Sequence, residues 1–331
     1  MIRHLLQLIW NQRKQNAWLW AELLLVSVFL WFLVDYLYVM GRTYTAPLGF
    51  DIRHTYSIVI SSLSERSPDY IPKEKRERPD GVHLLTALDR IRTYPGVESA
   101  CLTDGGMPYY MGSRNLVWRI DTLQVPCRYA FVTPEFFDVF RIYDKDGKTA
   151  SLKRAIEDNN SIVISADVET MNPGLSLLGQ KAYRGNVTDE IEETIRGISV
   201  PIRRHEYTKA EPNVYRALRL SRMEEGYYEG MIDAVRLCVR VRPDVDNADF
   251  PARFRKDMAE QLRLGNLYLL DVQPLSYIRD GYIRSIGVEN EVKTRVAVAC
   301  FLLANIFLGI IGTFWFRTES VSYTHLRAHE T

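Results

Sequence analysis

Two long apolar blocks, one near each end of the 331-residue chain, constrain its fold more than any other feature. The first extends from Ala17 to Met40 and is interrupted only by Glu22 and Asp35. The second extends from Val296 to Phe316 and contains no Asp, Glu, Lys or Arg. Because a helix rises about 1.5 Å per residue, about twenty residues cross the roughly 30 Å of membrane hydrocarbon. The blocks therefore predict two transmembrane helices, residues 17–40 and 296–316.

The average composition conceals these blocks. Lys and Arg total 42 against 41 Asp and Glu, and 47% of the residues are hydrophobic. The near-zero net charge excludes the clustered basic surface that nucleic-acid binding requires. The ordinary numbers of Gly, Pro and Cys exclude the collagen-like, disordered and disulfide-scaffold classes. The composition thus fits a membrane protein whose polar residues lie between two spans.

The amino-terminal flank sets the expected orientation. Arg3, Arg13 and Lys14 precede the first block, and no acidic residue accompanies them. The positive-inside rule places such a flank in the cytoplasm, so residues 41–295 are expected outside the cytoplasmic membrane. The alternative is a cleaved signal peptide with Leu23–Val34 as its hydrophobic core. Against it, the preceding stretch is long and no convincing small-residue cleavage site follows.

Residues 1–16 show the spacing of an amphipathic helix. The apolar residues Ile2, Leu5 and Ile9 recur on a helical period, and polar residues occupy the positions between them. We predict a cytoplasmic helix whose apolar face contacts membrane lipid in the headgroup layer. Alternatively, these residues begin one long first helix that continues into the first span.

The segment between the spans alternates strand and helix patterns. Its roughly 250 residues suffice for one large or two small domains. Predicted strands are residues 56–60, 97–102, 116–120, 127–133, 161–165, 195–200 and 234–241, and predicted helices are residues 81–94, 134–140, 166–171 and 249–264. This mixture predicts an α+β domain of short strands and helices, residues 41–270, with its sheet covered on one side. Val239–Arg242 alternates apolar and basic residues, as expected of a strand with one solvated face.

Two further segments have distinct patterns. Ser64–Pro79 is charged and contains prolines, which predicts an exposed loop. Residues 271–295 carry Leu275, Ile278 and Tyr282 at helical spacing. We expect a continuous stalk helix there that runs into the second span and couples the domain mechanically to the membrane.

The sequence contains none of the common catalytic motifs. Gly-x-x-x-x-Gly-Lys-Ser/Thr, His-Glu-x-x-His and Gly-x-Ser-x-Gly are all absent. Asp104–Gly106 and Asp146–Gly147 are predicted turns that lack the strand and helix context of a phosphate-binding loop. His325 and His329 have a spacing that suits a metal, but their surroundings look foreign to the chain. We therefore expect no enzyme activity, catalytic residue, cofactor or metal site.

Three cysteines lie in the segment expected in an oxidising compartment, and Cys300 lies in the second span. The three are Cys101, Cys127 and Cys238, which permit at most one internal bridge. Cys101 and Cys127 fall in predicted strands, where buried free thiols are expected. Whether any pair is bridged stays open at this point.

Short motifs occur in an order typical of one family. They are Tyr94–Glu98 (YPGVE) after a helix, Tyr129–Phe140 (YAFVTPEFFDVF), Ser161–Ser165 (SIVIS), Leu178–Lys181 (LGQK) and Gly309–Ser320 (GIIGTFWFRTES). With two spans around an α+β segment, the chain resembles the amino-terminal part of MacB/FtsX-type ABC transporter permeases, including the MacB-like periplasmic core domain. The resemblance covers about residues 1–320.

The resemblance implies a multi-pass permease subunit of the inner (plasma) membrane, with a cytoplasmic N-terminus and a periplasmic domain. In such mechanotransmitters a partner ABC ATPase hydrolyses ATP in the cytoplasm, and stalk helices carry its motion to the periplasmic domains. The family also implies a permease dimer and a periplasmic adaptor or substrate protein as partners. The implied role is periplasmic export or envelope remodelling. The alternative function is a two-span sensor whose periplasmic domain binds a ligand.

Residues 317–331 comprise the cytoplasmic exit and a tail that departs from the family pattern. Permeases of this type continue from their cytoplasmic exit into a coupling region and two further spans. Val321–Thr331 (VSYTHLRAHET) neither follows that pattern nor forms an apolar span, and it looks like foreign sequence. We therefore expect a truncated reading frame, with a natural two-span protein as the alternative.

Overall fold

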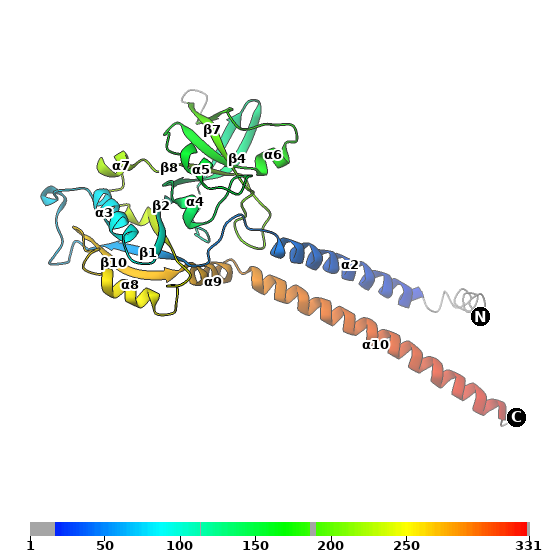
Figure 1. Cartoon of the computed structure of the whole chain (residues 1–331). Coiled ribbons are helices and arrows are strands. Elements are labelled where there is room, and N and C mark those ends of the chain that lie inside the picture. The colour runs from blue at the N-terminus through cyan, green and yellow to red at the C-terminus, as the bar shows by residue number, and fades with distance from the viewer. Residues whose placement is uncertain (1–16, 113, 186–189, 330–331) are drawn as a thin grey trace. The chain divides into compact units, whose positions relative to one another are not determined.

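The computed structural model describes residues 17–112, 114–185 and 190–329 (Figure 1). They form two units: a helical unit, residues 17–45 and 287–329, and a compact domain, Ala46–Ile286. The α+β fold expected for the domain is confirmed, because the domain combines short strands with short helices. The amphipathic helix expected in residues 1–16 lies outside the described residues.

The helical unit consists of α2 (Ala17–Thr45) and α10 (Val288–His329), which contact each other. Both helices are long and apolar enough to cross a membrane by length and composition. The stretches that meet this criterion are Leu24–Thr45 and Val288–Gly309. The two predicted spans therefore fall within helices of the required kind.

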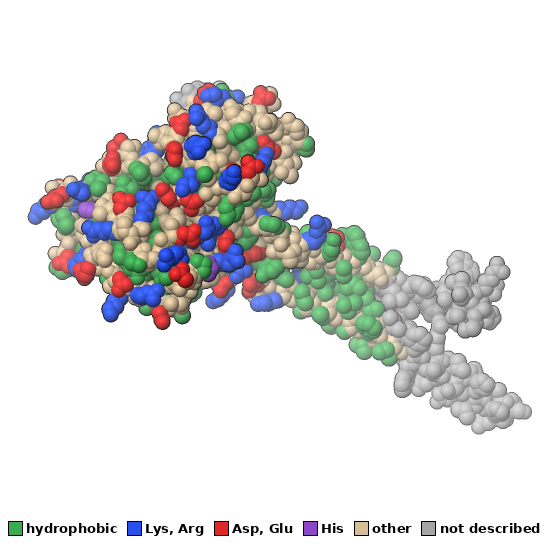
Figure 2. All heavy atoms as spheres, in the orientation of Figure 1, with side chains coloured by type: hydrophobic (Ala, Val, Ile, Leu, Met, Phe, Trp, Pro, Cys, Tyr) green, Lys and Arg blue, Asp and Glu red, His purple; other side chains and the backbone are tan. Residues whose placement is uncertain are grey.

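The surface of these two helices is apolar. Figure 2 shows hydrophobic side chains gathered over α2 and the described part of α10, and large ones such as Phe29 and Phe301 are exposed. A continuous exposed apolar surface needs an apolar surrounding or a partner. Near the start of α10, the Arg295 guanidinium lies 3.8 Å from the centroid of the Tyr36 ring and pairs with Glu291.

The domain is built on one ten-stranded sheet. Its strands are β1 (Thr55–Ser62), β2 (Val97–Asp104), β3 (Asn115–Ile120), β4 (Leu123–Val132), β5 (Ser161–Ser165), β6 (Lys181–Arg184), β7 (Ile191–Ser199), β8 (Asn213–Ala217), β9 (Val235–Val241) and β10 (Leu267–Pro274). The strand order is β10-β1-β9-β2-β4-β3-β6-β7-β5-β8, and β4 also pairs with β8. This extra pairing closes the last six strands into a barrel, whereas β10-β1-β9-β2 form an open antiparallel layer.

Short helices pack on this sheet. They are α3 (Asp80–Arg92), α4 (Phe136–Val139), α5 (Ala150–Ala155), α6 (Asp167–Met171), α7 (Leu220–Glu224), α8 (Phe250–Met258) and α9 (Leu275–Ser285), with 3-10 turns at Lys73–Lys75 and Ile232–Ala234. Every strand and helix predicted between residues 56 and 264 is present, and all except the strand at residues 161–165 have shifted ends. The sequence did not predict β6, β8, β10, α5 or α7.

Both faces of strand β9 in the open layer are buried, so the expectation of a sheet covered on one side is wrong there. Successive side chains of a strand point to opposite faces. On β9, Leu237 and Val239 belong to the core that includes α3 and α8, whereas Cys238 belongs to the core that includes α4. Arg240, expected on a solvated face, is only 3% exposed. Val239 and Arg240 therefore point to opposite faces that are both buried. Of residues 239–242, only Arg242 is exposed to solvent.

The motif at residues 129–140 supplies core residues. Its second half forms α4, and Phe136, Phe137 and Phe140 are fully buried. The rings of Phe136 and Phe140 meet edge to face with their centroids 4.9 Å apart. Aromatic pairs in this geometry add to the stabilisation from burial. The motif therefore has a packing role in this domain.

The predicted continuous stalk helix over residues 271–295 is wrong. Its first residues belong to β10, whose backbone pairs with β1. Helix α9 follows and ends before Gly287, which has a φ of +70°. This left-handed conformation ends helices and suits glycine, which has no Cβ to clash. The domain consequently extends to Ile286, beyond the predicted limit at residue 270, and α9 belongs to it.

The cysteines of the domain are buried and carry free thiols. Cys101 on β2 and Cys238 on β9 are register partners on neighbouring strands. Burial raises the pKa of the Cys127 thiol to about 12 and raises that of Cys101 as well. These two thiols therefore remain protonated at neutral pH and react poorly with thiol reagents.

Candidate functional site

The chain enters the domain through residues 46–54, here called the connecting segment. It joins α2 to β1 and is neither helix nor strand. Because the segment forms no helix or strand, its backbone carbonyls need hydrogen-bond donors from elsewhere in the domain or from water. Two buried arginines, Arg240 and Arg203, supply most of them.

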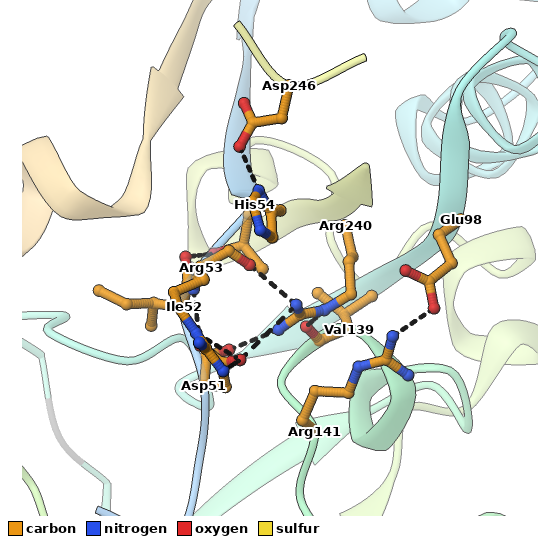
Figure 3. Close-up of polar contacts among 10 residues, drawn as sticks. Asp51, Ile52, Arg53, His54, Glu98, Val139, Arg141, Arg240 and Asp246 are labelled. Atoms are coloured by element: carbon orange, nitrogen blue, oxygen red, sulfur yellow. Dashed lines mark hydrogen bonds and ion pairs between the residues drawn. The ribbon is translucent and has the colours of Figure 1, made fainter. Parts of the chain in front are cut away.

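Arg240 binds the connecting segment from strand β9 (Figure 3). Its Nη1 donates to the carbonyl of Arg53 at 2.8 Å and its Nη2 to that of Asp51 at 2.7 Å. Its Nε donates to the carbonyl of Val139, at the end of α4, at 2.7 Å. Burial lowers the pKa of Arg240, and the Asp51 carboxylate opposes that change. One guanidinium thus ties together the connecting segment, β9 and α4.

The Asp51 carboxylate keeps its charge beside this guanidinium. Burial acts to raise its pKa, but hydrogen bonds from Arg53 and the charge of Arg240 hold the pKa below its usual value. The backbone N–H of Asp51 also donates to the carbonyl of Phe140 at 2.8 Å. The connecting segment is therefore fixed by charge and by main-chain bonds together.

Arg203 binds the start of the connecting segment. It lies in residues 201–210, here called the bridging loop, and is 4% exposed. Its Nη1 donates to the carbonyl of Ala46 at 2.5 Å, and its backbone N–H donates to the carbonyl of Leu48 at 3.0 Å. Its Nε donates within the loop to the carbonyl of Thr208 at 2.7 Å. The first residues after α2 are thus bound to the bridging loop by hydrogen bonds.

The same loop holds α9, the helix that precedes α10 in the chain. The buried Glu206 carboxylate accepts a bond of 2.5 Å from Arg279 Nε on α9 and one of 2.9 Å from the Tyr109 hydroxyl. Although burial acts to raise the pKa of Glu206, the bond from Arg279 leaves it lowered overall. The Tyr282 ring of α9 also packs against His205, with centroids 5.8 Å apart. The bridging loop therefore binds the connecting segment, which follows α2, and α9, which precedes α10.

A groove of about 730 Å³ lies beside Arg240. Its charged lining consists of Asp51, Arg53, His54, Glu98, Arg141 and Arg240. Figure 3 shows Arg141 and Glu98 directed toward each other, as an ion pair. His54 Nδ1 lies 2.5 Å from Asp246 Oδ2. Because these charges already have partners, the groove offers a polar surface, not an activated nucleophile.

Two residues at this groove have left-handed backbones. The φ angle is 58° at His54 and 50° at Arg141. Such conformations cost non-glycine residues on the order of 1 kcal/mol each and persist where surrounding contacts enforce them. The hydrogen bonds of Arg240 are such contacts, because they hold the backbone at Arg53, next to His54, and at Val139, two residues before Arg141.

Sequence reasoning assigned no site residues, and the structure shows what it missed. Arg240 was interpreted as solvated, and Arg203 and Glu206 were not singled out. The signal that the sequence offers for such a residue is a charged side chain within an apolar strand pattern. Of Arg240, Arg203 and Glu206, only Arg240 shows it. Among the described residues no group of three metal-ligating side chains is found, and the side chains of His325 and His329 are not among those described.

No protein-family model and no curated protein matches the chain. Among solved structures, the chain is similar to a domain described as that of a permease protein from Porphyromonas gingivalis. The identity is 19% and the TM-score 0.45, and the match covers 69% of this chain and 92% of that one. It is also similar to the periplasmic region of MacB from Actinobacillus actinomycetemcomitans. Here the identity is 9% and the TM-score 0.39, over 74% of this chain and 97% of that one.

A third similar structure is the extracellular domain of the noncanonic ABC-type transporter YknZ from Gram-positive bacteria. The identity is 12% and the TM-score 0.37, over 65% of this chain and all of that one. Similarities of this size do not by themselves assign a family or a function to the chain.

Replacing Arg240 tests its role in holding the connecting segment. In Arg240→Met, three carbonyls lose their donor, and each unsatisfied buried group costs about 1–3 kcal/mol. We expect a lower urea midpoint and at least tenfold faster hydrogen exchange in residues 46–54. The matched control is Arg242→Met, an exposed position two residues further on, for which both quantities should stay at wild-type values. Unchanged exchange in Arg240→Met would contradict the assignment.

The Glu206–Arg279 pair predicts a pH-dependent contribution to stability. Because the folded pKa of Glu206 lies below its ordinary 4.5, the contribution is complete above the ordinary value and disappears as pH falls through the folded value. Glu206→Gln should therefore melt at a lower temperature than the wild type at pH 7, with a loss of about 1–3 kcal/mol. That gap should shrink as the pH falls below 4.5. A gap that is independent of pH would show that the charge of Glu206 does not matter.

Proposed function

We propose that the chain is the membrane subunit of an ABC transporter of the mechanotransmission type. The observation that carries the proposal is the bridging loop, which binds the residues after α2 and the helix before α10. A displacement of either apolar helix would reach the same short loop through hydrogen bonds of its buried residues Arg203 and Glu206. The order of the family motifs and the two apolar helices support the same assignment.

In this proposal the chain transmits motion and catalyses no reaction. A cytoplasmic ABC ATPase hydrolyses ATP, and the permease works as a dimer in the inner membrane, with its N-terminus in the cytoplasm. The domain Ala46–Ile286 lies in the periplasm, where an adaptor or substrate protein is its partner. The work done is periplasmic export or envelope remodelling.

The physical basis for transmission is stiffness at the connections. Segments with few buried contacts open locally at low free energy and would absorb a displacement. The connecting segment instead has its carbonyls bound to Arg203 and Arg240, both at most 4% exposed. On the other side, the charge-assisted bond between Glu206 and Arg279 fixes α9 to the loop, and bonds of this type are among the stronger ones in proteins. The domain can therefore move as a rigid unit when the connecting segment or α9 is displaced.

This proposal predicts a separation between ATP hydrolysis and transport. In Arg279→Gln, the bond from α9 to the bridging loop loses its charge, while residues 17–45 and 287–329 keep their sequence. We expect the rate of ATP hydrolysis by the complex with its ATPase to stay within about twofold of the wild type. Complementation of the phenotype caused by deleting the gene should fall by tenfold or more.

The control for that experiment is Lys209→Gln, which removes an exposed cation from the same loop and should behave as the wild type. Full complementation by Arg279→Gln would contradict transmission through this loop. If the native protein associates with no ATPase, the permease assignment fails and the two-span sensor becomes the better hypothesis.

A further inference from the structure

A second cavity lies on the barrel side of the bridging loop, apart from the groove beside Arg240. Its volume is about 40 Å³, and it is lined by β4, β8, the turn at residues 105–110 and the bridging loop. A water molecule needs about 10–15 Å³ of such space, so the cavity accommodates about three water-sized groups. Its polar lining includes Arg128, Arg204, Asn213 and Tyr215.

Two guanidiniums in this cavity lack acidic partners. Among the described residues, the side chains of Arg128 and Arg204 make no hydrogen bond or ion pair, and the Nε atoms of both are buried. The Arg204 guanidinium lies over the Tyr282 ring, 5.9 Å from its centroid. Burial lowers the pKa of Arg128, and the nearby charge of Arg204 lowers it further. Two like charges this close repel each other, and burial adds a further cost at Arg128, unless an anion lies between them.

The carboxylates in the neighbourhood do not supply that anion. Glu206 accepts from Arg279 and Tyr109 at its Oε1, and neither Arg128 nor Arg204 pairs with its buried Oε2. The charge of Glu211 raises the pKa of Arg128, but among the described residues the Glu211 carboxylate accepts no hydrogen bond from Arg128. Burial raises the pKa of Asp167, and its Oδ2 already accepts from the backbone of Ile202 at 3.3 Å. The cavity thus has an excess of positive charge.

The remaining lining can also bind an anion. Burial raises the pKa of Tyr215, so its phenol stays protonated and can donate a hydrogen bond. Guanidinium groups present paired N–H donors in a plane, a geometry that matches carboxylate and phosphate oxygens. Arg128 comes from β4 and Arg204 from the bridging loop, so a ligand held by both would join the loop to the barrel.

We propose that this cavity binds a small oxyanion, a carboxylate or a phosphate group, between Arg128 and Arg204. The bound group neutralises both guanidiniums and braces the bridging loop against β4. The proposal does not rest on the proposed transport function, because the observations behind it concern the domain alone.

The test is a thermal titration of the full chain in detergent micelles, in a low-salt Tris chloride buffer. Inorganic phosphate and acetate are added separately, and sodium chloride of equal ionic strength is the reference. We expect a saturable rise in melting temperature with one or both oxyanions and none with chloride. Saturation by phosphate alone identifies a phosphate site, and saturation by acetate alone identifies a carboxylate site. No saturable rise with either would overturn the proposal.

Variants connect the titration to the two arginines. Arg128→Gln and Arg204→Gln should each weaken the apparent affinity at least tenfold, whereas Arg154→Gln, an exposed position on α5, should leave it unchanged. Without added oxyanion, Arg128→Gln should melt at or above the wild-type temperature, because it removes an unpaired buried charge. A large fall in that temperature would instead show that Arg128 is a structural residue. Equal affinity in wild type and both variants would place the binding elsewhere and contradict the proposal.

Discussion

Main-chain carbonyls of a segment that forms neither helix nor strand, bound by two buried arginines, are the constraint on which this domain depends. The chain must pass from an apolar helix into a sheet, and residues 46–54 do so without forming helix or strand. Their carbonyls would be costly to bury alone. Arg240 and Arg203 meet that need with several donors each, and the bonds of Arg240 also fix the end of α4 through Val139. The two arginines act as structural cross-links between segments far apart in the sequence.

The same arrangement is the basis of the proposed mechanical role of the domain. The bridging loop carries Arg203, which binds the residues after α2, and Glu206, which binds Arg279 on α9. Because α9 ends before Gly287, the connection to α10 is not one continuous rod. In the proposed function, a displacement of α10 would therefore reach the domain through α9. The bridging loop binds both α9 and the connecting segment. The cavity with Arg128 and Arg204 is also lined by this loop and by β4, so an anion bound there would add a third attachment.

The sequence predicted most of the local structure and little of the site. Periodicity located the apolar helices and most strands, because those patterns depend on local burial. It failed over residues 271–274, where pairing with β1, more than two hundred residues earlier in the chain, overrides the helical pattern. The closure of the barrel by β4 and β8 is likewise a long-range pairing that no short window reveals.

Arg240 shows why the site itself was not predictable. An alternating Val-Arg-Val-Arg pattern is the same whether the arginine meets water or the carbonyls of a distant segment. Glu206 and Arg203 lie in an irregular loop, where charged residues are ordinarily solvated. Their burial follows from three segments meeting at one place, and that is a property of the tertiary structure.

The central claim is that the bridging loop and α9 move as one body. The most direct test measures the distance between spin labels at two exposed positions, residue 209 in the loop and residue 284 in α9, in the complex with its ATPase. The account predicts one narrow distance distribution that is the same in the nucleotide-free and ATP-bound states, and a broadened one in Glu206→Gln. A distance that changes with nucleotide in the wild type, or that is unaffected by Glu206→Gln, would contradict it.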